Sequence, residues 1–168
     1  MTHNQSFDKT FNTIHSMKFP ILISSLLLVL VLGCSKDKGC EPVTPQNELP
    51  QIEKFINDNS LVGVNSSNGI YYQIINAGFG ATPNLNSTLD VTYKGKYLNG
   101  EVFEESTNIV TFQLNRVIEG WQLGIPLIKK GGKINLIIPS AYAYGCAGNA
   151  PIPPNAVLYF EISLIDVR

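Results

Sequence analysis

The one tryptophan of the chain, Trp121, stands directly after a glycine in the segment 116–124, Arg-Val-Ile-Glu-Gly-Trp-Gln-Leu-Gly. A large aromatic side chain at the end of an apolar strand can serve as ordinary core, or it can form the floor of an apolar pocket. In the second case its chemistry would be the non-covalent binding of an apolar group. From this segment alone, both interpretations stay open.

Nucleophilic and metal chemistry lack their usual residues in the expected mature chain. Both histidines, His3 and His15, precede Cys34, where we expect processing to cut the chain. A chain that begins at Cys34 has no histidine, which excludes Ser–His, Cys–His and His–metal sites. We therefore expect no metal and no cofactor.

The N-terminal segment has the pattern of an export signal. Met17 is followed by Lys18 and an apolar run over 19–32, which is typical of a signal peptide and shorter than the about 20 residues of a membrane span. The run ends in Val-Leu-Gly-Cys at 31–34, which resembles the lipobox of bacterial lipoproteins. We expect a signal peptide over 1–33, with Met17 as the possible true start and Cys34 diacylated; the alternative is an ordinary signal peptide or anchor with a coincidental cysteine.

Two cysteines, Cys40 and Cys146, follow the expected cleavage site. Exported proteins fold in oxidising compartments, where such a pair can form a disulfide. A bridge and two unpaired thiols both remain open. A catalytic cysteine is not expected, because the mature chain offers it no histidine partner.

The composition fits one globular domain behind a leader. Apolar residues make up 44% of the chain, which is enough for a core, and the net charge of −1 offers no basic face for nucleic acid. We expect a lipidated tether over 34–47, a helix and linker over 48–68, and the domain over 69–168.

The periodicity predicts an α+β domain. Apolar residues at 49, 52, 55 and 56 predict an amphipathic helix over 48–59 with Pro50 in its first turn, and Pro126 predicts that the helix over 121–128 is short or distorted. Asn-Gly at 99–100 predicts a hairpin. Strands are expected over 69–75, 88–98, 101–105, 109–114, 133–138 and 156–167, with loops over 106–108 and 139–154.

Six short blocks follow one another along the second half of the chain. They are Val-Thr-Tyr-Lys-Gly at 91–95, Asn-Gly-Glu-Val-Phe at 99–103, Phe-Gln-Leu at 112–114, Val-Ile-Glu-Gly-Trp at 117–121, Ile-Pro with Ala-Tyr-Gly at 138–145, and Ile-Pro-Pro-Asn-Ala with Leu-Tyr-Phe at 152–160. In this order they resemble the FKBP-type peptidyl-prolyl cis-trans isomerases over about residues 69–168. Together with the lipobox and the preceding helix, they resemble the FKBP-type lipoproteins of Bacteroidetes-like bacteria, some of them associated with gliding motility.

The resemblance implies a half-wrapped antiparallel sheet packed on one short helix, with a pocket between them. It makes Trp121 the pocket floor and gives the Tyr144 hydroxyl and the Ile118 N–H as donors to peptide carbonyls. With Ile152 at the rim beside Tyr144, the implied walls are Tyr93, Phe103, Val117, Ile118 and Phe160.

Three departures from the family pattern concern the pocket. Glu104 stands where the family usually has Asp, and we count it with Trp121 and Tyr144 in the catalytic set. The arginine that often pairs with that Asp has no evident counterpart in 106–109. Val110 falls where the family has a second aromatic residue, so we expect a less aromatic wall there.

The implied function is an isomerase that assists the folding of exported proteins. Its clients would be proline-containing polypeptides, and it would act as a monomer, lipid-anchored in the cell envelope. We expect the outer membrane, and the sequence leaves open whether the domain faces the periplasm or the cell exterior. The alternative is a weakly active or inactive binding module for a proline-containing partner in envelope assembly or motility.

Overall fold

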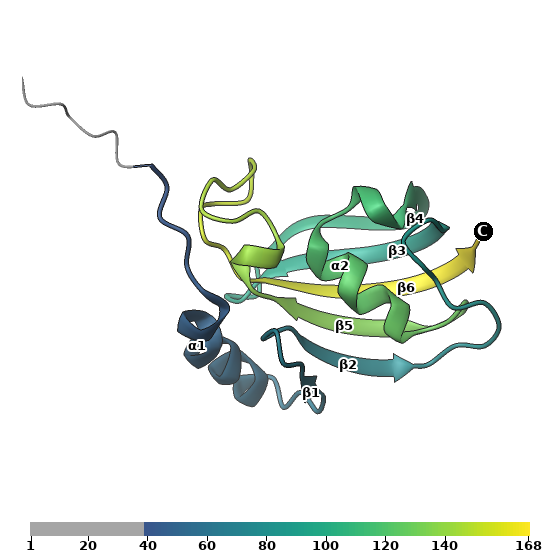
Figure 1. Ribbon diagram of the computed structural model, residues 1–168. Coiled ribbons are helices and arrows are strands. Elements are labelled where there is room, and N and C mark those ends of the chain that lie inside the picture. Colours follow the sequence, from purple (N-terminus) through teal and green to yellow (C-terminus); the bar gives the residue numbers. More distant parts are fainter. Residues whose placement is uncertain (1–38) are drawn as a thin grey trace, which may run out of the picture. The chain divides into compact units, whose positions relative to one another are not determined.

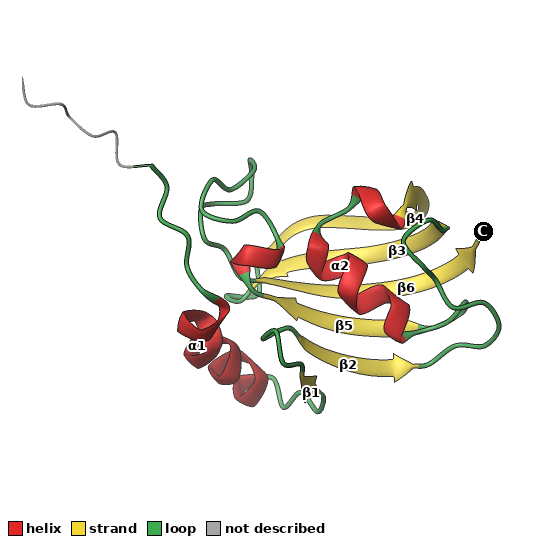
Figure 2. Cartoon of the chain, in the orientation of Figure 1, coloured by secondary structure: helices red, strands yellow, loops and turns green. Residues whose placement is uncertain are grey.

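The computed structural model describes residues 39–168 (Figure 1). Six antiparallel strands form one sheet in the order β1-β2-β5-β6-β3-β4. The strands are β1 (Val64–Asn65), β2 (Tyr71–Asn76), β3 (Thr88–Tyr97), β4 (Val102–Gln113), β5 (Lys133–Ile138) and β6 (Leu158–Val167). The helices are α1 (Pro45–Asp58) and α2 (Glu119–Gly124), with 3₁₀ helices at Leu114–Arg116, Ile125–Leu127 and Ser140–Tyr142 (Figure 2).

Two apolar clusters cover the two faces of the sheet. Leu136 and Phe160, which are paired in register, belong to the larger cluster with Trp121 of α2. Ile137 and Tyr159, the next pair along, belong to the smaller cluster with α1. Successive strand residues point to opposite faces, so α1 and α2 pack on opposite sides of the sheet.

Helix α1 begins three residues before the predicted helix. Thr44 stands in the extended geometry of an N-cap, and Pro45 takes the first helical turn, where its missing N–H costs nothing. Pro50, expected in the first turn, therefore lies inside the helix. Residues 48, 52 and 55 are buried at helical spacing, which places an acidic residue, Glu48, on the packed face.

Helix α2 begins at Glu119 rather than at Trp121, and it lies very close to β5. A Cβ added to Gly120 would come 2.4 Å from the Cγ2 of Ile138, so only glycine permits this approach. The helix continues directly into the 3₁₀ helix Ile125–Leu127, whose first turn accommodates Pro126. The predicted short or distorted helix thus takes the form of an α-helical turn followed by a tighter one.

The segment 106–108, predicted as a loop, lies inside β4. The pairing between β3 and β4 passes from Val91 opposite Val110 to Tyr93 opposite Ser106, so the extra residues bulge out of a continuous strand. The hairpin at 99–100 is present, with Gly100 at φ +90°.

The predicted α+β class and the antiparallel sheet on a short helix are confirmed. The signal peptide, Met17 and Cys34 lie outside the described residues, and the division of the chain that we predicted around them stays a prediction. No helix within residues 39–168 combines the length and apolar character that crossing a membrane requires.

Candidate functional site

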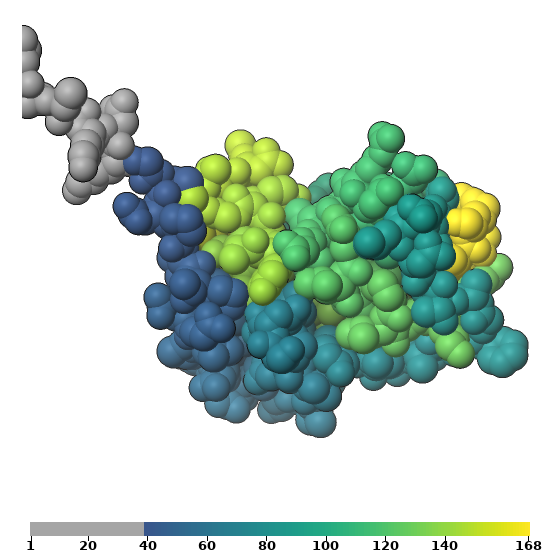
Figure 3. All heavy atoms as spheres, in the orientation of Figure 1, coloured from purple at the N-terminus to yellow at the C-terminus, as the bar shows by residue number. Residues whose placement is uncertain are grey.

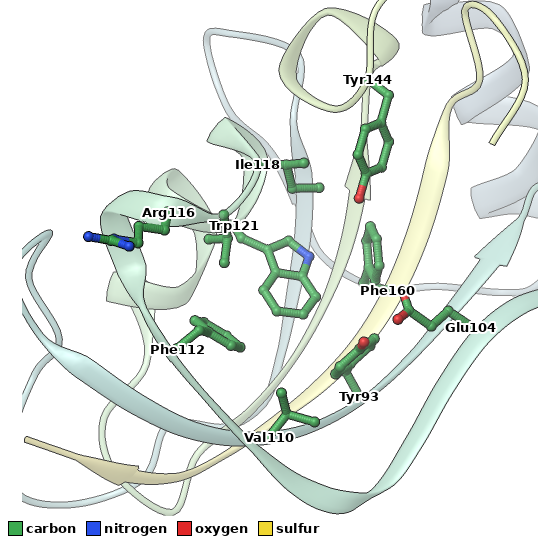
Figure 4. Close-up of a pocket in the computed structure, with 10 residues that line it drawn as sticks. Tyr93, Glu104, Val110, Phe112, Arg116, Ile118, Trp121, Tyr144 and Phe160 are labelled. Carbon is green, nitrogen blue, oxygen red and sulfur yellow. The ribbon is translucent and has the colours of Figure 1, made fainter. Parts of the chain in front are cut away.

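A pocket with a cavity volume of about 290 Å³ opens between α2 and the sheet (Figure 4). Its residues come from β3, β4, β6, α2 with the turn before it, and the loop after β5. They are Tyr93, Glu104, Val110, Phe112, Arg116, Val117, Ile118, Trp121, Tyr144 and Phe160.

Trp121 is held in place by three aromatic rings. The ring centroids of Tyr93 and Phe160 lie 5.1 and 5.2 Å from that of the indole, with interplanar angles of 79° and 85°. Phe112 lies at 5.5 Å with a 46° tilt. Edge-to-face packing of this kind is favourable beyond the burial of area. The indole is 6% exposed, and its N–H has no hydrogen-bond partner among the described residues, so the ring forms a rigid apolar surface.

Two hydrogen-bond donors stand beside the indole. The hydroxyl of Tyr144 points into the pocket from the loop after β5, and Ile118 lies between Tyr144 and Trp121 (Figure 4). Ile118 is the N-cap of α2, and its carbonyl accepts from the N–H groups of Trp121 and Gln122 at 3.0 and 3.3 Å. The hydrogen bonds found within residues 39–168 use neither the Ile118 N–H nor the Tyr144 O–H, so both can donate to a ligand.

The charged residues of the pocket are Glu104 and Arg116, and no ion pair joins them to another side chain in the described part of the chain. Burial raises the pKa of the Tyr93 phenol, and the neighbouring Glu104 carboxylate raises it further. Burial and then the charge of Glu104 raise the pKa of Tyr144 in the same direction. Both phenols therefore stay protonated, and able to donate, at neutral and mildly alkaline pH.

Most predicted site residues line the pocket, and two do not. Phe103 lies behind the wall: its ring packs edge-on against Phe160, at a centroid distance of 5.6 Å, in the space that Gly95 leaves open. Ile152 is 6% exposed and packs in the main core. Both are therefore supports for the pocket rather than its surface.

Sequence reasoning missed Phe112 and Arg116 as lining residues. The wall expected to be less aromatic at Val110 receives the ring of Phe112 instead, two residues along β4. Alternation along a strand puts these two side chains on one face, so the periodicity of the segment held the signal. Arg116 ends the 3₁₀ helix that follows β4, which no local pattern predicted.

The structure joins Cys40 and Cys146 in a disulfide, with Cα atoms 5.3 Å apart. The bridge links the N-terminal segment to the loop that carries Tyr144. The sequence left open whether these two cysteines form a bridge or stay unpaired thiols, and the structure contains the bridge.

A short helix laid across an antiparallel sheet, with an aromatic-floored pocket between them, defines an FKBP-like domain. The sequence profile of the FKBP-type peptidyl-prolyl cis-trans isomerases matches residues 80–165. The chain belongs to this family.

Named relatives agree with this assignment. FkpA of Escherichia coli K12, an FKBP-type peptidyl-prolyl cis-trans isomerase, is 43% identical over 119 residues, which cover 69% of this chain and 43% of FkpA. A probable FKBP-type isomerase of Haemophilus influenzae is 43% identical over 107 residues, 61% of this chain and 44% of the relative. The chain thus spans less than half the length of these relatives.

Solved structures show the same fold. The crystal structure of Escherichia coli FkpA superposes with a TM-score of 0.67 at 41% identity, covering 73% of this chain and 60% of that one. A peptidyl-prolyl cis-trans isomerase of Pseudomonas syringae superposes with a TM-score of 0.63 at 31% identity, covering 76% and 98%.

Proposed function

We propose that this chain is a peptidyl-prolyl cis-trans isomerase that assists the folding of exported proteins. One observation carries the proposal: a rigid, buried Trp121 floors an apolar pocket beside two donors that the protein itself does not use. Such a site fits a proline ring on the indole, with the carbonyls that flank the ring within reach of Tyr144 and Ile118.

The reaction needs no bond to be made to the protein. Rotation about the X–Pro bond breaks amide resonance, at a barrier of about 18–20 kcal/mol, and takes tens to hundreds of seconds unaided. Turnover at about 10 per second, an ordinary value for an enzyme, would be an acceleration of roughly 10³. That corresponds to about 4 kcal/mol of transition-state stabilisation.

The described residues can supply an effect of this size. An apolar pocket that excludes water disfavours the planar, charge-separated form of the amide more than the twisted one. Hydrogen bonds from Tyr144 and Ile118 would hold the peptide while the bond turns, and each such bond contributes about 1 kcal/mol. The raised pKa of Tyr144 keeps its hydroxyl in the donating form.

The test is a coupled protease assay of a proline tetrapeptide with the full chain in detergent. We expect wild-type protein to accelerate the slow phase in proportion to its concentration, and Tyr144→Phe to lower kcat/KM by about fivefold, which is what about 1 kcal/mol corresponds to. Tyr142→Phe is the matched control, because Tyr142 lies in the same loop and does not line the pocket. Background rates with wild-type protein would refute the proposal.

A second candidate is a binding module for a proline-containing envelope partner in assembly or motility. It is favoured by Glu104, which stands where the family usually has Asp and forms no ion pair within residues 39–168. Titration of Trp121 fluorescence with a proline peptide separates the candidates. Saturable binding without any acceleration of isomerisation would support the binding module and would refute the isomerase function.

The setting is part of the proposal. We place the protein in the cell envelope as a monomer anchored in the outer membrane through a diacylated Cys34, as in the FKBP-type lipoproteins that its sequence resembles. The Cys40–Cys146 bridge supports this placement, because disulfides persist in oxidising compartments. Mass spectrometry of the membrane fraction tests it, and a chain with an unmodified N-terminus would contradict it.

A further inference from the structure

Glu48 is the one buried carboxylate among residues 39–168. It is 1% exposed, and its Oε2 accepts a hydrogen bond of 2.9 Å from the backbone N–H of Ser140. Its other oxygen has no partner in the described residues. An acidic group is costly to bury, so an apolar residue would be expected on this face of α1 if packing alone mattered.

Ser140 connects Glu48 to the pocket. While the Ser140 N–H donates to Glu48, the Ser140 carbonyl accepts from the N–H groups of Ala143 and Gly145, at 3.0 and 2.8 Å. These two residues stand on either side of Tyr144. A single residue, Ser140, therefore joins the carboxylate of α1 to the backbone that aims the Tyr144 hydroxyl into the pocket.

Two further contacts fasten the same loop to the N-terminal segment. Cys40 is bridged to Cys146. The side-chain amide of Asn155 donates to the Glu41 carbonyl at 3.2 Å, while the Asn155 backbone N–H donates to the carbonyl of Gly145 at 2.9 Å. In Figure 3 the blue N-terminal segment lies against the yellow-green loop.

The base of this arrangement is fixed to the sheet. Ile52 and Phe55 of α1 pack against Tyr71, Ile137 and Tyr159, with Ile52 fully buried. The segment 40–58 is thus anchored in the core at one end and holds the Tyr144 loop at three points. We call it the N-terminal clamp.

We propose that Glu48 is a positioning residue for Tyr144, and that the N-terminal clamp is part of the isomerase site rather than a mere spacer. The proposal rests on the proposed function for its effect on catalysis. Glu48 touches no substrate; it acts by fixing Ser140, and through Ser140 the two amides that flank Tyr144.

The test compares Glu48→Ala and Glu48→Gln in the full chain, each with and without Tyr144→Phe. Glu48→Ala removes the acceptor, and we expect kcat/KM to fall by up to about fivefold, the loss expected when the Tyr144 hydroxyl itself is removed. Glu48→Gln keeps a carbonyl oxygen in place, and we expect it to retain most activity. In the Tyr144→Phe background Glu48→Ala should cost less than about twofold, because the group that it positions is already gone. Glu53→Ala, an exposed glutamate on the same helix, is the matched control.

Amide hydrogen exchange provides a readout that does not need activity. We expect faster exchange at Ala143 and Gly145 in Glu48→Ala, and wild-type protection in Glu48→Gln. If wild-type protein does not catalyse, the proposed function fails and exchange at these two amides alone decides the positioning role. Unchanged protection overturns that role, as does an equal loss of activity in both Tyr144 backgrounds.

A second variant guards against failure of Glu48→Ala to fold. Replacing both Cys40 and Cys146 by serine releases the clamp at its other end without touching the core. We expect this variant to lose protection at Gly145, and to lose activity only while Tyr144 is present. Protection and activity at wild-type level would overturn the clamp.

Discussion

Gly120 offers a sharp test of how the pocket floor is positioned. It precedes Trp121, and the packing of α2 on β5 depends on its lack of a side chain. In Gly120→Ala the new Cβ would lie 2.4, 2.7 and 2.9 Å from the Cγ2, Cδ1 and Cγ1 of Ile138. Carbon atoms in ordinary contact are about 3.5–4.0 Å apart, so α2 has to move outward by about 1 Å.

The two consequences of this shift have different sizes. Overpacking costs about 1–3 kcal/mol, and the better helix propensity of alanine returns up to about 1 kcal/mol, which leaves a net loss of about 1–2 kcal/mol. A domain whose unfolding free energy is about 5–15 kcal/mol stays folded after a loss of that size. A 1 Å displacement of a positioning surface, in contrast, can cost roughly 10² in rate.

Urea unfolding followed by the fluorescence of Trp121, with kcat/KM measured on the same samples, reads both effects. Ile138→Ala deletes all three atoms that the new Cβ would contact. The double variant Gly120→Ala/Ile138→Ala should therefore be at least about 1 kcal/mol more stable than the sum of the two single-variant losses predicts. Gly39→Ala is the control, because a Cβ there meets nothing within 4 Å. The close-approach account fails if Gly120→Ala matches wild type in stability and in rate.

Three further predictions concern ionisation. Burial, followed by the negative charge of Glu161, raises the pKa of Tyr159 to about 12. The contribution of the protonated phenol to folding stability is therefore complete below about pH 10 and is lost as the pH rises through about 12. The urea midpoint of unfolding should fall over that interval, and it should fall less in Tyr159→Phe. Parallel falls in the two proteins would contradict this. Glu104→Gln should lower the pKa of Tyr93 while leaving it above the ordinary value, because burial is the larger cause; an unshifted phenolate absorbance titration would be the contrary result. The hydrogen bond from Arg168 and, to a smaller extent, the one from Thr111 lower the pKa of Asp90. Ionised Asp90 therefore stabilises the folded state at pH values above its pKa in the unfolded chain, and this stabilisation is lost as the pH falls through its lower pKa in the folded state. Arg168→Ala should therefore flatten the acid fall in stability, and an unchanged pH dependence would exclude that pair as its source.

Prediction from the sequence was most accurate where glycine or proline residues flank an element. The strand over 133–138 has the predicted ends, because glycines precede it and a proline follows it. At α1 the same kind of reasoning was wrong: Pro50 suggested a first turn, whereas Pro45 takes that place. A proline indicates where a helix can begin, and two candidates in one segment leave the choice to tertiary packing.

Long-range pairing explains the other differences. Polar residues at 106–108 look like a loop, yet pairing with β3 carries β4 through them as a bulge. Glu48 looks like a solvated helix residue, because its partner Ser140 lies 92 positions away. The pocket residues were named through the resemblance to a family; alternation along β4 would have added Phe112, and the support roles of Phe103 and Ile152 became visible only in three dimensions.

The central claim is that Trp121 floors a site that catalyses proline isomerisation. The most direct measurement is the exchange rate between the cis and trans forms of a proline tetrapeptide, followed by NMR with catalytic amounts of the full chain. Wild-type protein is expected to raise the exchange rate by orders of magnitude, and Trp121→Ala, with its folded state checked by circular dichroism, to lose at least about tenfold of it. Exchange at the uncatalysed rate with wild-type protein, or undiminished catalysis by folded Trp121→Ala, would contradict the account.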